Sequence, residues 1–168
     1  MSAGGISLPP AILLISMFLS FFVAILLIVF DQIVKFLTVT NLQVGESARG
    51  IANVFDFFYL RNDGAGWGLF SGRVNFFLII TVLAAAYIIY LIFKNRDHHF
   101  ITRLSYGLIL GGAVGNFIDR IRLGYVIDMF RLKFIDFPIF NVADAALTIG
   151  VVLLIIVILF FENTEDVL

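Results

Sequence analysis

The chain has 168 residues, of which 61% are hydrophobic and only 14% are charged, and its mean hydropathy is +1.07. Soluble domains carry about 45–50% apolar and about 25% charged residues, so this composition excludes an ordinary soluble protein and indicates a membrane protein. The formal net charge of -1 argues against a nucleic-acid partner, and the absence of cysteine excludes thiol catalysis, disulfides and thiolate metal sites.

The first predicted element is a helix over 11–30, which is an almost unbroken apolar run. A run of about 20 residues suffices to cross a hydrocarbon core of roughly 30 Å. A signal peptide would begin with basic residues, and no Lys or Arg precedes Ala11, so we interpret the run as a permanent span. Asp31 and Lys35 follow it at a spacing of i,i+4, which predicts an ion pair at the membrane interface.

A polar connection over 38–73 comes next, and its segment 54–60 is aromatic and rich in β-forming residues, which predicts a short strand. Two further apolar runs, 74–93 and 104–118, predict the second and third spans, joined by the short charged connection 94–103. In lipid the backbone polar groups must be satisfied within the segment, so we expect each span to be a helix.

The third span carries glycine every fourth residue, at Gly107, Gly111 and Gly115. Small residues at this spacing let two helix backbones approach closely, so we expect this face to pack on a neighbouring helix. The span ends in polar residues, with Asn116 and Asp119 on one face. The simplest structural interpretation of Asp119 is a charge pair with the adjacent arginine.

The fourth predicted span covers 139–161. We therefore predict an all-α polytopic membrane protein, a single domain over 1–168 with four transmembrane helices and a small β-containing segment. Four spans place both termini on one side of the membrane and gather the polar span ends at one face. The basic residues of the connections do not indicate which face is cytoplasmic, because they occur on both sides.

Asp144 lies five residues inside the predicted fourth span, about 8 Å along the helix axis. An ionisable group in an apolar helix costs about 2.5–3.5 kcal/mol at the bilayer centre, so it is a functional candidate by default. At this depth the carboxyl group would lie near the interface. Asn141, three residues earlier, shares its helix face.

Carboxylates are the remaining acid–base groups, because cysteine is absent and histidine occurs only as His98 and His99 in a charged stretch. Two aspartates that share a site cannot both ionise easily, so one can activate water while the other donates a proton to a carbonyl oxygen. Asp119, Asp128 and Asp136 are the candidate partners of Asp144. The apolar frame of Asp128 favours that residue, since desolvation raises a carboxyl pKa.

Two other functions fit a cluster of intramembrane aspartates. A proton or ion transporter would show internal repeats and a site at the midplane, neither of which the sequence indicates. A membrane scaffold held together by the glycine face would need no catalytic pair. An intramembrane protease of the Gly-x-Gly-Asp type is disfavoured, because that motif is absent.

Five motifs in order resemble those of the lipoprotein signal peptidase (signal peptidase II) family. They begin at the end of the first predicted span and cover most of the chain. Each alone is weak, but together and in this order they are highly specific. The segments are Asp-Gln-x-x-Lys at 31–35, Arg-Asn-Asp-Gly-Ala-Gly-Trp-Gly at 61–68, Gly-Asn-Phe-Ile-Asp-Arg at 115–120, Gly-Tyr-Val-Ile-Asp at 124–128 and Phe-Pro-Ile-Phe-Asn-Val-Ala-Asp at 137–144.

The resemblance implies cleavage of bacterial prolipoproteins just before a diacylglyceryl-modified cysteine. It implies an aspartyl endopeptidase whose catalytic pair is Asp128 and Asp144, with no metal and no cofactor. Two departures from the family pattern are Gly66, where a second alanine is usual, and Met129, where phenylalanine is usual. The supporting and substrate-binding residues that the motifs imply are Asp31, Lys35, Asn62, Gly64, Asn116, Asp119, Arg120 and Asn141.

The family's topology implies a multi-pass protein of the bacterial plasma membrane with both termini in the cytoplasm. The catalytic pair would then lie near the extracytoplasmic face, and the 38–73 segment outside the membrane. The expected partners are a lipid-modified prolipoprotein and membrane lipids, and not nucleic acid. We expect a monomer, because the catalytic pair is complete within one chain.

Overall fold

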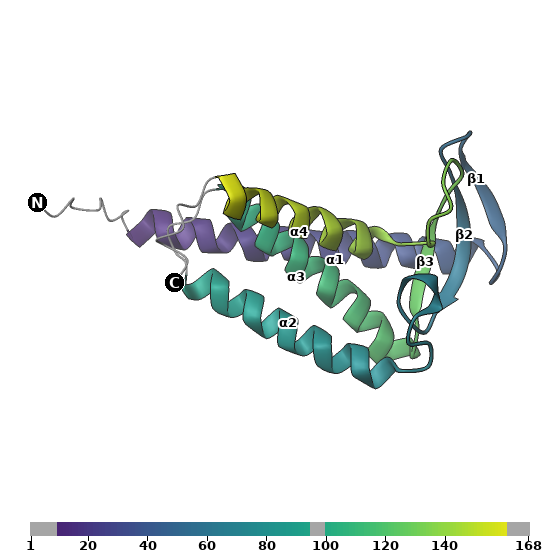
Figure 1. Ribbon diagram of the computed structural model, residues 1–168, viewed down its shortest axis with the longest axis horizontal. Coiled ribbons are helices and arrows are strands. Elements are labelled where there is room, and N and C mark those ends of the chain that lie inside the picture. The colour runs from purple at the N-terminus through teal and green to yellow at the C-terminus, as the bar shows by residue number, and fades with distance from the viewer. Residues whose placement is uncertain (1–9, 95–99, 161–168) are drawn as a thin grey trace, which may run out of the picture.

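The computed structural model describes residues 10–94 and 100–160, so the adjacent His98 and His99 lie outside the described residues. Within these ranges, four helices run alongside one another and carry a small sheet at one end (Figure 1). This end is where the first and third helices finish and the second and fourth begin. The helices are α1 (Pro10–Asn41), α2 (Val74–Lys94), α3 (Phe100–Leu123) and α4 (Val142–Phe160).

Three of the described helices are long and apolar enough to cross a membrane: α1, α2 and α4. The predicted runs thus locate these helices, but α1 extends past the predicted end at residue 30 and finishes at Asn41. Asp31 and Lys35 therefore lie inside a continuous helix, where they form the predicted ion pair, and both are buried.

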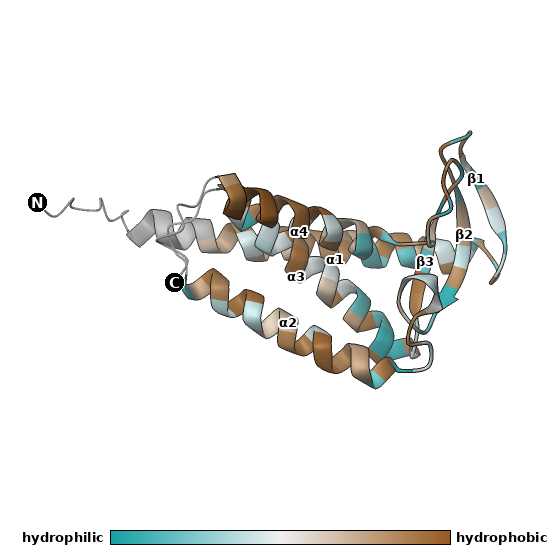
Figure 2. Cartoon of the chain, in the orientation of Figure 1, coloured by the Kyte–Doolittle hydropathy of each residue, from teal (hydrophilic) through white to brown (hydrophobic). Residues whose placement is uncertain are grey.

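The membrane-spanning character predicted for 104–118 is not confirmed, because α3 is not among the described helices whose length and composition suit a span. α3 lies against α1, α2 and α4 and buries thirteen residues, several of them polar. Figure 2 shows it paler than its neighbours, which are strongly hydrophobic. A helix that is covered by protein does not need a lipid-compatible surface, which explains its lower hydropathy.

The predicted glycine face packs α3 closely onto α1. A Cβ atom at Gly107 would lie 2.7 Å from the backbone oxygen of Ser20, and one at Gly111 would lie 3.0 Å from that of Ala24. Because these neighbours are backbone atoms, side chains at either position would push the helices apart. The close approach brings the polar ends of α1 and α3 together.

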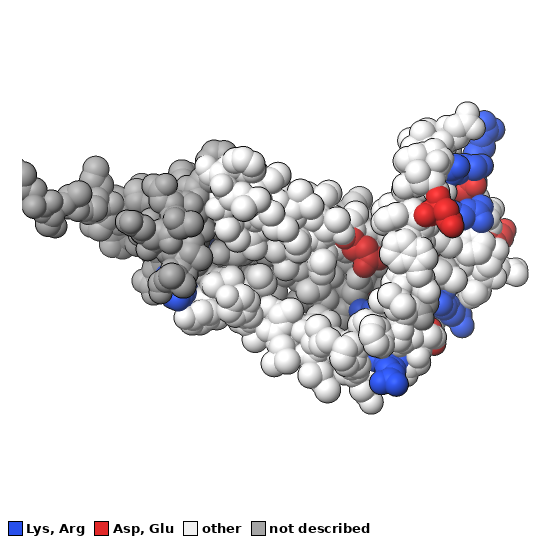
Figure 3. Space-filling view, in the orientation of Figure 1, with Lys and Arg blue, Asp and Glu red and all other residues white. Residues whose placement is uncertain are grey.

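The sheet has three antiparallel strands in the order β1-β2-β3. The predicted strand 54–60 is present, and two more strands were not predicted. Leu60 pairs with Asp128, so the sheet joins the long first connection to the connection between α3 and α4. Most of the charged side chains visible in Figure 3 gather at this end of the molecule. The strands are β1 (Ser47–Ile51), β2 (Phe55–Asn62) and β3 (Val126–Leu132).

Candidate active site

Asp144 lies in the first turn of α4, where Asn141 caps the helix. The Asn141 Oδ1 atom accepts a hydrogen bond from the Asp144 backbone N–H at 2.9 Å, and the Asp144 carboxylate accepts one from the Asn141 backbone N–H at 3.2 Å. This reciprocal pair is a capping box. Asp144 is thus two residues past the helix start, because Phe140 is still bonded to Phe130 as extended chain. The predicted depth of five residues is wrong.

Asp128 lies in the middle of β3 and is fully buried. Its Oδ2 atom accepts a hydrogen bond from Asn62 Nδ2 at 2.8 Å, and its Oδ1 atom accepts one from Asn141 Nδ2 at 2.7 Å. Burial, followed by the charge of Asp144, raises the pKa of Asp128 to about 7, although the two amide donors act in the opposite direction. This carboxyl group can therefore exchange a proton near neutral pH.

Two asparagine side chains link the aspartates into one network. Asn116 Nδ2 donates to Asp144 Oδ1 at 2.7 Å, and Asn141 Nδ2 donates to Asn116 Oδ1 at 3.0 Å as well as to Asp128. Each aspartate therefore receives an amide donor, and among the described residues neither is bonded to a cationic side chain. Neutral donors orient the carboxylates without fixing both of them as permanently ionised.

Both aspartates line one cavity of about 530 Å³, which we call the aspartate cavity. Asn62 and Asn116 lie in its wall, as does Arg120. The cavity also extends along α4 to Thr148 and Ile149. It is therefore polar near the carboxyl groups and more apolar along the helix, a combination typical of sites in which a few polar groups orient a largely apolar ligand.

The loop after β2 covers the cavity and depends on Gly64. Asn62 Oδ1 accepts a hydrogen bond from the Gly64 backbone N–H at 3.0 Å, and Arg120 Nη2 donates to the Gly64 carbonyl at 3.2 Å. A Cβ atom at Gly64 would lie 2.6 Å from the Leu69 backbone oxygen, so only glycine fits. At Gly66 a Cβ would meet nothing closer than Pro138 at 3.4 Å, so that departure relieves no clash.

Behind the aspartate cavity, Lys35 is the centre of a buried ion cluster. Its Nζ atom lies 2.9 Å from Asp31 Oδ2 and 2.9 Å from Asp119 Oδ2, and it donates to Asn116 Oδ1 at 3.0 Å. Asp119 thus pairs with Lys35, and not with Arg120 as the simple charge-pair interpretation expects. The cluster holds α1 against α3, and Asp31 Oδ1 also accepts the Ala143 backbone N–H of α4 at 3.0 Å.

The structure separates the three candidate partners of Asp144. Only Asp128 lines the aspartate cavity, whereas Asp119 belongs to the ion cluster and Asp136 is exposed in the loop after β3. The supporting residues that the motifs imply divide in the same way between the cavity and the cluster. Met129 is fully buried beside Tyr59, so it serves the core of the sheet.

Sequence reasoning missed two polar residues near these groups. Gln32 Nε2 donates to Asp119 Oδ1 at 3.0 Å, and Thr148 lines the aspartate cavity one turn after Asp144. Gln32 belongs to the motif that begins at Asp31, and Thr148 follows Asp144 at i+4 on the same helix face. Either pattern could have indicated these positions.

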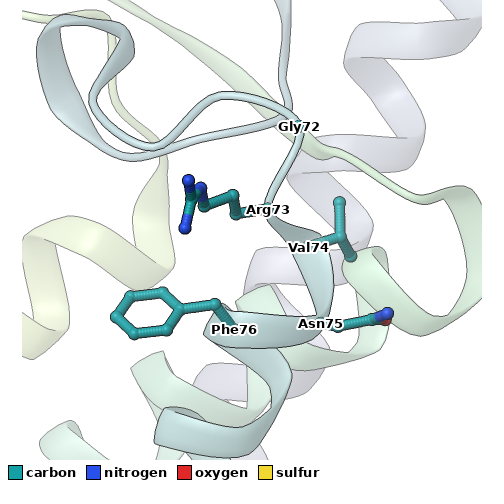
Figure 4. Close-up of a pocket in the computed structure, with 5 residues that line it drawn as sticks. All are labelled: Gly72, Arg73, Val74, Asn75 and Phe76. Carbon is teal, nitrogen blue, oxygen red and sulfur yellow. The ribbon is translucent and has the colours of Figure 1, made fainter.

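A separate cavity of about 360 Å³ lies at the start of α2 (Figure 4). Its lining contains one basic side chain and no acidic one, so it offers no acid–base pair. Its position at the start of a different helix distinguishes it from the aspartate cavity. It is lined by Gly72, Arg73, Val74, Asn75 and Phe76.

Comparisons with known proteins identify the family of the chain. The model of the family described as signal peptidase (SPase) II matches residues 23–160. The chain is 43% identical to a lipoprotein signal peptidase of Lactobacillus johnsonii, covering 85% of this chain and 93% of that protein, and 44% identical to one of Latilactobacillus sakei, covering 89% and 100%.

The fold is also similar to that of a bacterial membrane enzyme solved by the in meso method at 2.3 Å resolution. The TM-score is 0.80 at 36% sequence identity, and the match covers 88% of this chain and 90% of the other. Family model, relatives and fold therefore agree over most of the length, and the chain belongs to the signal peptidase II family, a family of membrane proteases.

Proposed function

We propose that this protein is an aspartyl endopeptidase that removes the signal peptide from diacylglyceryl-modified bacterial prolipoproteins, cleaving before the lipidated cysteine. The observation that carries the proposal is the amide network that joins Asp128 and Asp144 at one cavity. Family membership supports a protease acting on lipoproteins, and the paired carboxylates supply the aspartic chemistry.

In the proposed reaction the two carboxyl groups share one proton. The ionised group takes a proton from water, and the resulting hydroxide attacks the scissile carbonyl carbon while the protonated group donates to the carbonyl oxygen. Collapse of the tetrahedral intermediate breaks the C–N bond, and a proton passes to the leaving amine. The raised pKa of Asp128, about 7, keeps this group able to hold and release a proton near neutral pH.

The other polar residues have positioning roles in this proposal. Asn62, Asn116 and Asn141 orient the two carboxylates through the hydrogen bonds described above. Gly64 and Arg120 hold the covering loop over the cavity, which limits access of bulk water. The Asp31–Lys35–Asp119 cluster fixes the ends of α1 and α3 behind the catalytic pair.

We further propose that α3 is a fourth span sheltered by the other three, within a single membrane domain. Both termini would be cytoplasmic, and the sheet and the aspartate cavity would lie at the extracytoplasmic face of the bacterial plasma membrane. The polar sheet end and the apolar shafts of α1, α2 and α4 support a sheet that lies at a membrane surface, and the choice of the extracytoplasmic side rests on the resemblance to the family (Figure 2). The chain would act as a monomer, since both aspartates of the cavity come from one chain.

Substitution of each aspartate tests the proposal. Purified Asp128→Asn and Asp144→Asn variants should each lose cleavage of a lipidated prolipoprotein by at least about a thousandfold, because removal of one member of a catalytic pair disables the whole pair. The wild-type protein should leave the unlipidated precursor intact. Near-normal cleavage by either variant would reject this pair, and loss with Asp119→Asn but not with Asp128→Asn would transfer the role to Asp119.

A further inference from the structure

A second cavity, of about 510 Å³, adjoins the aspartate cavity, and we call it the rim cavity. The two cavities share Asn62, Leu132 and the wall segments 65–67 and 137–139. In that wall the Trp67 and Phe137 rings meet edge to face, with centroids 6.0 Å apart. The two cavities therefore share one wall that contains this aromatic pair, and they are not independent hollows.

The two cavities extend in opposite directions. The aspartate cavity continues along α4 to Thr148 and Ile149, toward the apolar shafts of the helices. The rim cavity is lined beyond the shared wall by the ends of strands and the loops that follow them, at the sheet end of the molecule (Figure 1). These lining residues are Leu60, Arg61, Asp63, Arg131, Ile135 and Asp136.

The chemistry of the rim cavity differs from that of the aspartate cavity. Four of its six separate lining residues are charged, two acidic and two basic. Arg131 is bonded to Asp56 at 3.2 Å, and Asp63 Oδ1 accepts the Ser71 hydroxyl at 2.6 Å. Charged side chains of both signs suit an uncharged polar peptide chain better than an acyl chain, because burial of charge beside hydrocarbon is costly.

We propose that the rim cavity binds the segment of the mature lipoprotein that follows the lipidated cysteine. The proposal rests on the proposed function and deepens it. The signal peptide and the acyl chains would lie along α4 in the bilayer, and the scissile bond would lie at the two aspartates. The residues after the cysteine would then continue past the shared wall into the rim cavity. Binding energy from that remote segment would then accelerate cleavage.

Two lipopeptide substrates test this placement. Both carry the same signal peptide and the same diacylglyceryl cysteine, but one ends one residue after the cysteine and the other continues for five further uncharged polar residues. For the wild-type protein we expect kcat/KM to be about tenfold higher for the longer substrate, a ratio that corresponds to about 1.4 kcal/mol.

Ile135→Trp is the discriminating variant, because Ile135 lines only the rim cavity and is half exposed. The larger indole side chain should fill the cavity and bring the ratio of the two kcat/KM values close to one, while cleavage of the short substrate is unchanged. Phe134→Trp is the matched control, since Phe134 is the exposed residue that precedes Ile135 and lines neither cavity. This variant should keep the wild-type ratio.

Equal cleavage of both substrates by the wild-type protein would overturn the placement, as would an equal loss for both substrates in Ile135→Trp. The same holds if Phe134→Trp changes the ratio as much as Ile135→Trp does. Failure of the wild-type protein to cleave either lipopeptide would instead refute the proposed function, so the two failures are distinguishable.

Discussion

The Asp31–Lys35–Asp119 cluster and the Asp128–Asp144 pair each bring two aspartates together, but only the first contains a cation. Lys35 lies 2.9 Å from an oxygen of each aspartate in its cluster. The other pair receives amide hydrogen bonds and faces a cavity. In the first cluster an ion pair ties both carboxylates to Lys35, whereas the carboxylates of the second are held by neutral amides and face a cavity.

The two clusters are in contact through Asn116, whose carbonyl oxygen accepts from Lys35 while its amide donates to Asp144. Because an amide has distinct donor and acceptor ends, Lys35 determines which end of Asn116 faces the catalytic pair. In the proposed function the ion cluster thus orients Asn116, and the Asp128–Asp144 pair carries out the chemistry. Five predictions test this division of roles.

The largest expected effect is that of Lys35→Met, which keeps an unbranched side chain of similar volume and removes its charge. Two buried carboxylates would lose their cation, which typically costs about 3–5 kcal/mol of folding free energy. We expect thermal unfolding in detergent at a much lower temperature and loss of cleavage. A variant with wild-type stability would contradict a structural role for the cluster.

The pH dependence of cleavage should report the protonation of the Asp128–Asp144 pair. Since burial and the charge of Asp144 raise the pKa of Asp128 to about 7, kcat/KM should fall about tenfold per pH unit once the shared proton is lost above that value. A pH profile of lipopeptide cleavage in detergent measures this limb. Activity that stays constant from pH 6 to pH 9 would exclude a shared proton with this midpoint.

The free energy of unfolding should also depend on pH through the protonation of Asp128. The pKa of Asp128 in the folded protein lies above the ordinary value of 3.8, so the folded state binds the proton more tightly than the unfolded state. The contribution of Asp128 to the free energy of unfolding should therefore decrease as pH rises from about 4 to about 7. Asp128→Asn should remove this part of the pH dependence, and an unchanged profile would show that another group causes it.

A smaller effect is expected for Asn62→Ala, which removes one donor to Asp128 and the anchor of Gly64. Loss of the donor should raise the pKa of Asp128 further and move the alkaline limb to higher pH, because that hydrogen bond favours the ionised form. We expect kcat/KM at pH 7 to fall about tenfold. Asn75→Ala, at an exposed asparagine in α2, is the control and should leave the midpoint unchanged.

The helices were the most predictable part of the fold, because long apolar runs have few alternatives in a chain this hydrophobic. The end of α1 was not predictable from hydropathy, since Asp31 and Lys35 satisfy each other inside the helix. The strand β3 was missed because its short apolar frame around Asp128 shows no clear alternation and its strand partner, β2, is far away in the chain.

The choice of Asp128 over Asp119 illustrates what sequence could and could not give for the site. An apolar frame predicted a desolvated carboxyl group at Asp128, and that residue is fully buried. Nothing in the sequence predicted that Asp119 pairs with Lys35, 84 positions earlier, because that contact depends on the packing of α1 on α3.

The smallest expected effect is that of Lys133→Met, the same substitution in a cluster of opposite composition. Asp56 lies 3.1 Å from Lys133 and 3.2 Å from Arg131, so here one acid is shared by two bases on the sheet, where both basic side chains are partly exposed. Water and salt screen such pairs, and Asp56 keeps Arg131 as a partner when Lys133 is lost. We therefore expect the unfolding temperature to change by less than about 2 °C and cleavage to stay normal. If Lys133→Met destabilised the protein as much as Lys35→Met, burial would not be what separates the two clusters, and the orienting role assigned to Lys35 would lose its physical basis.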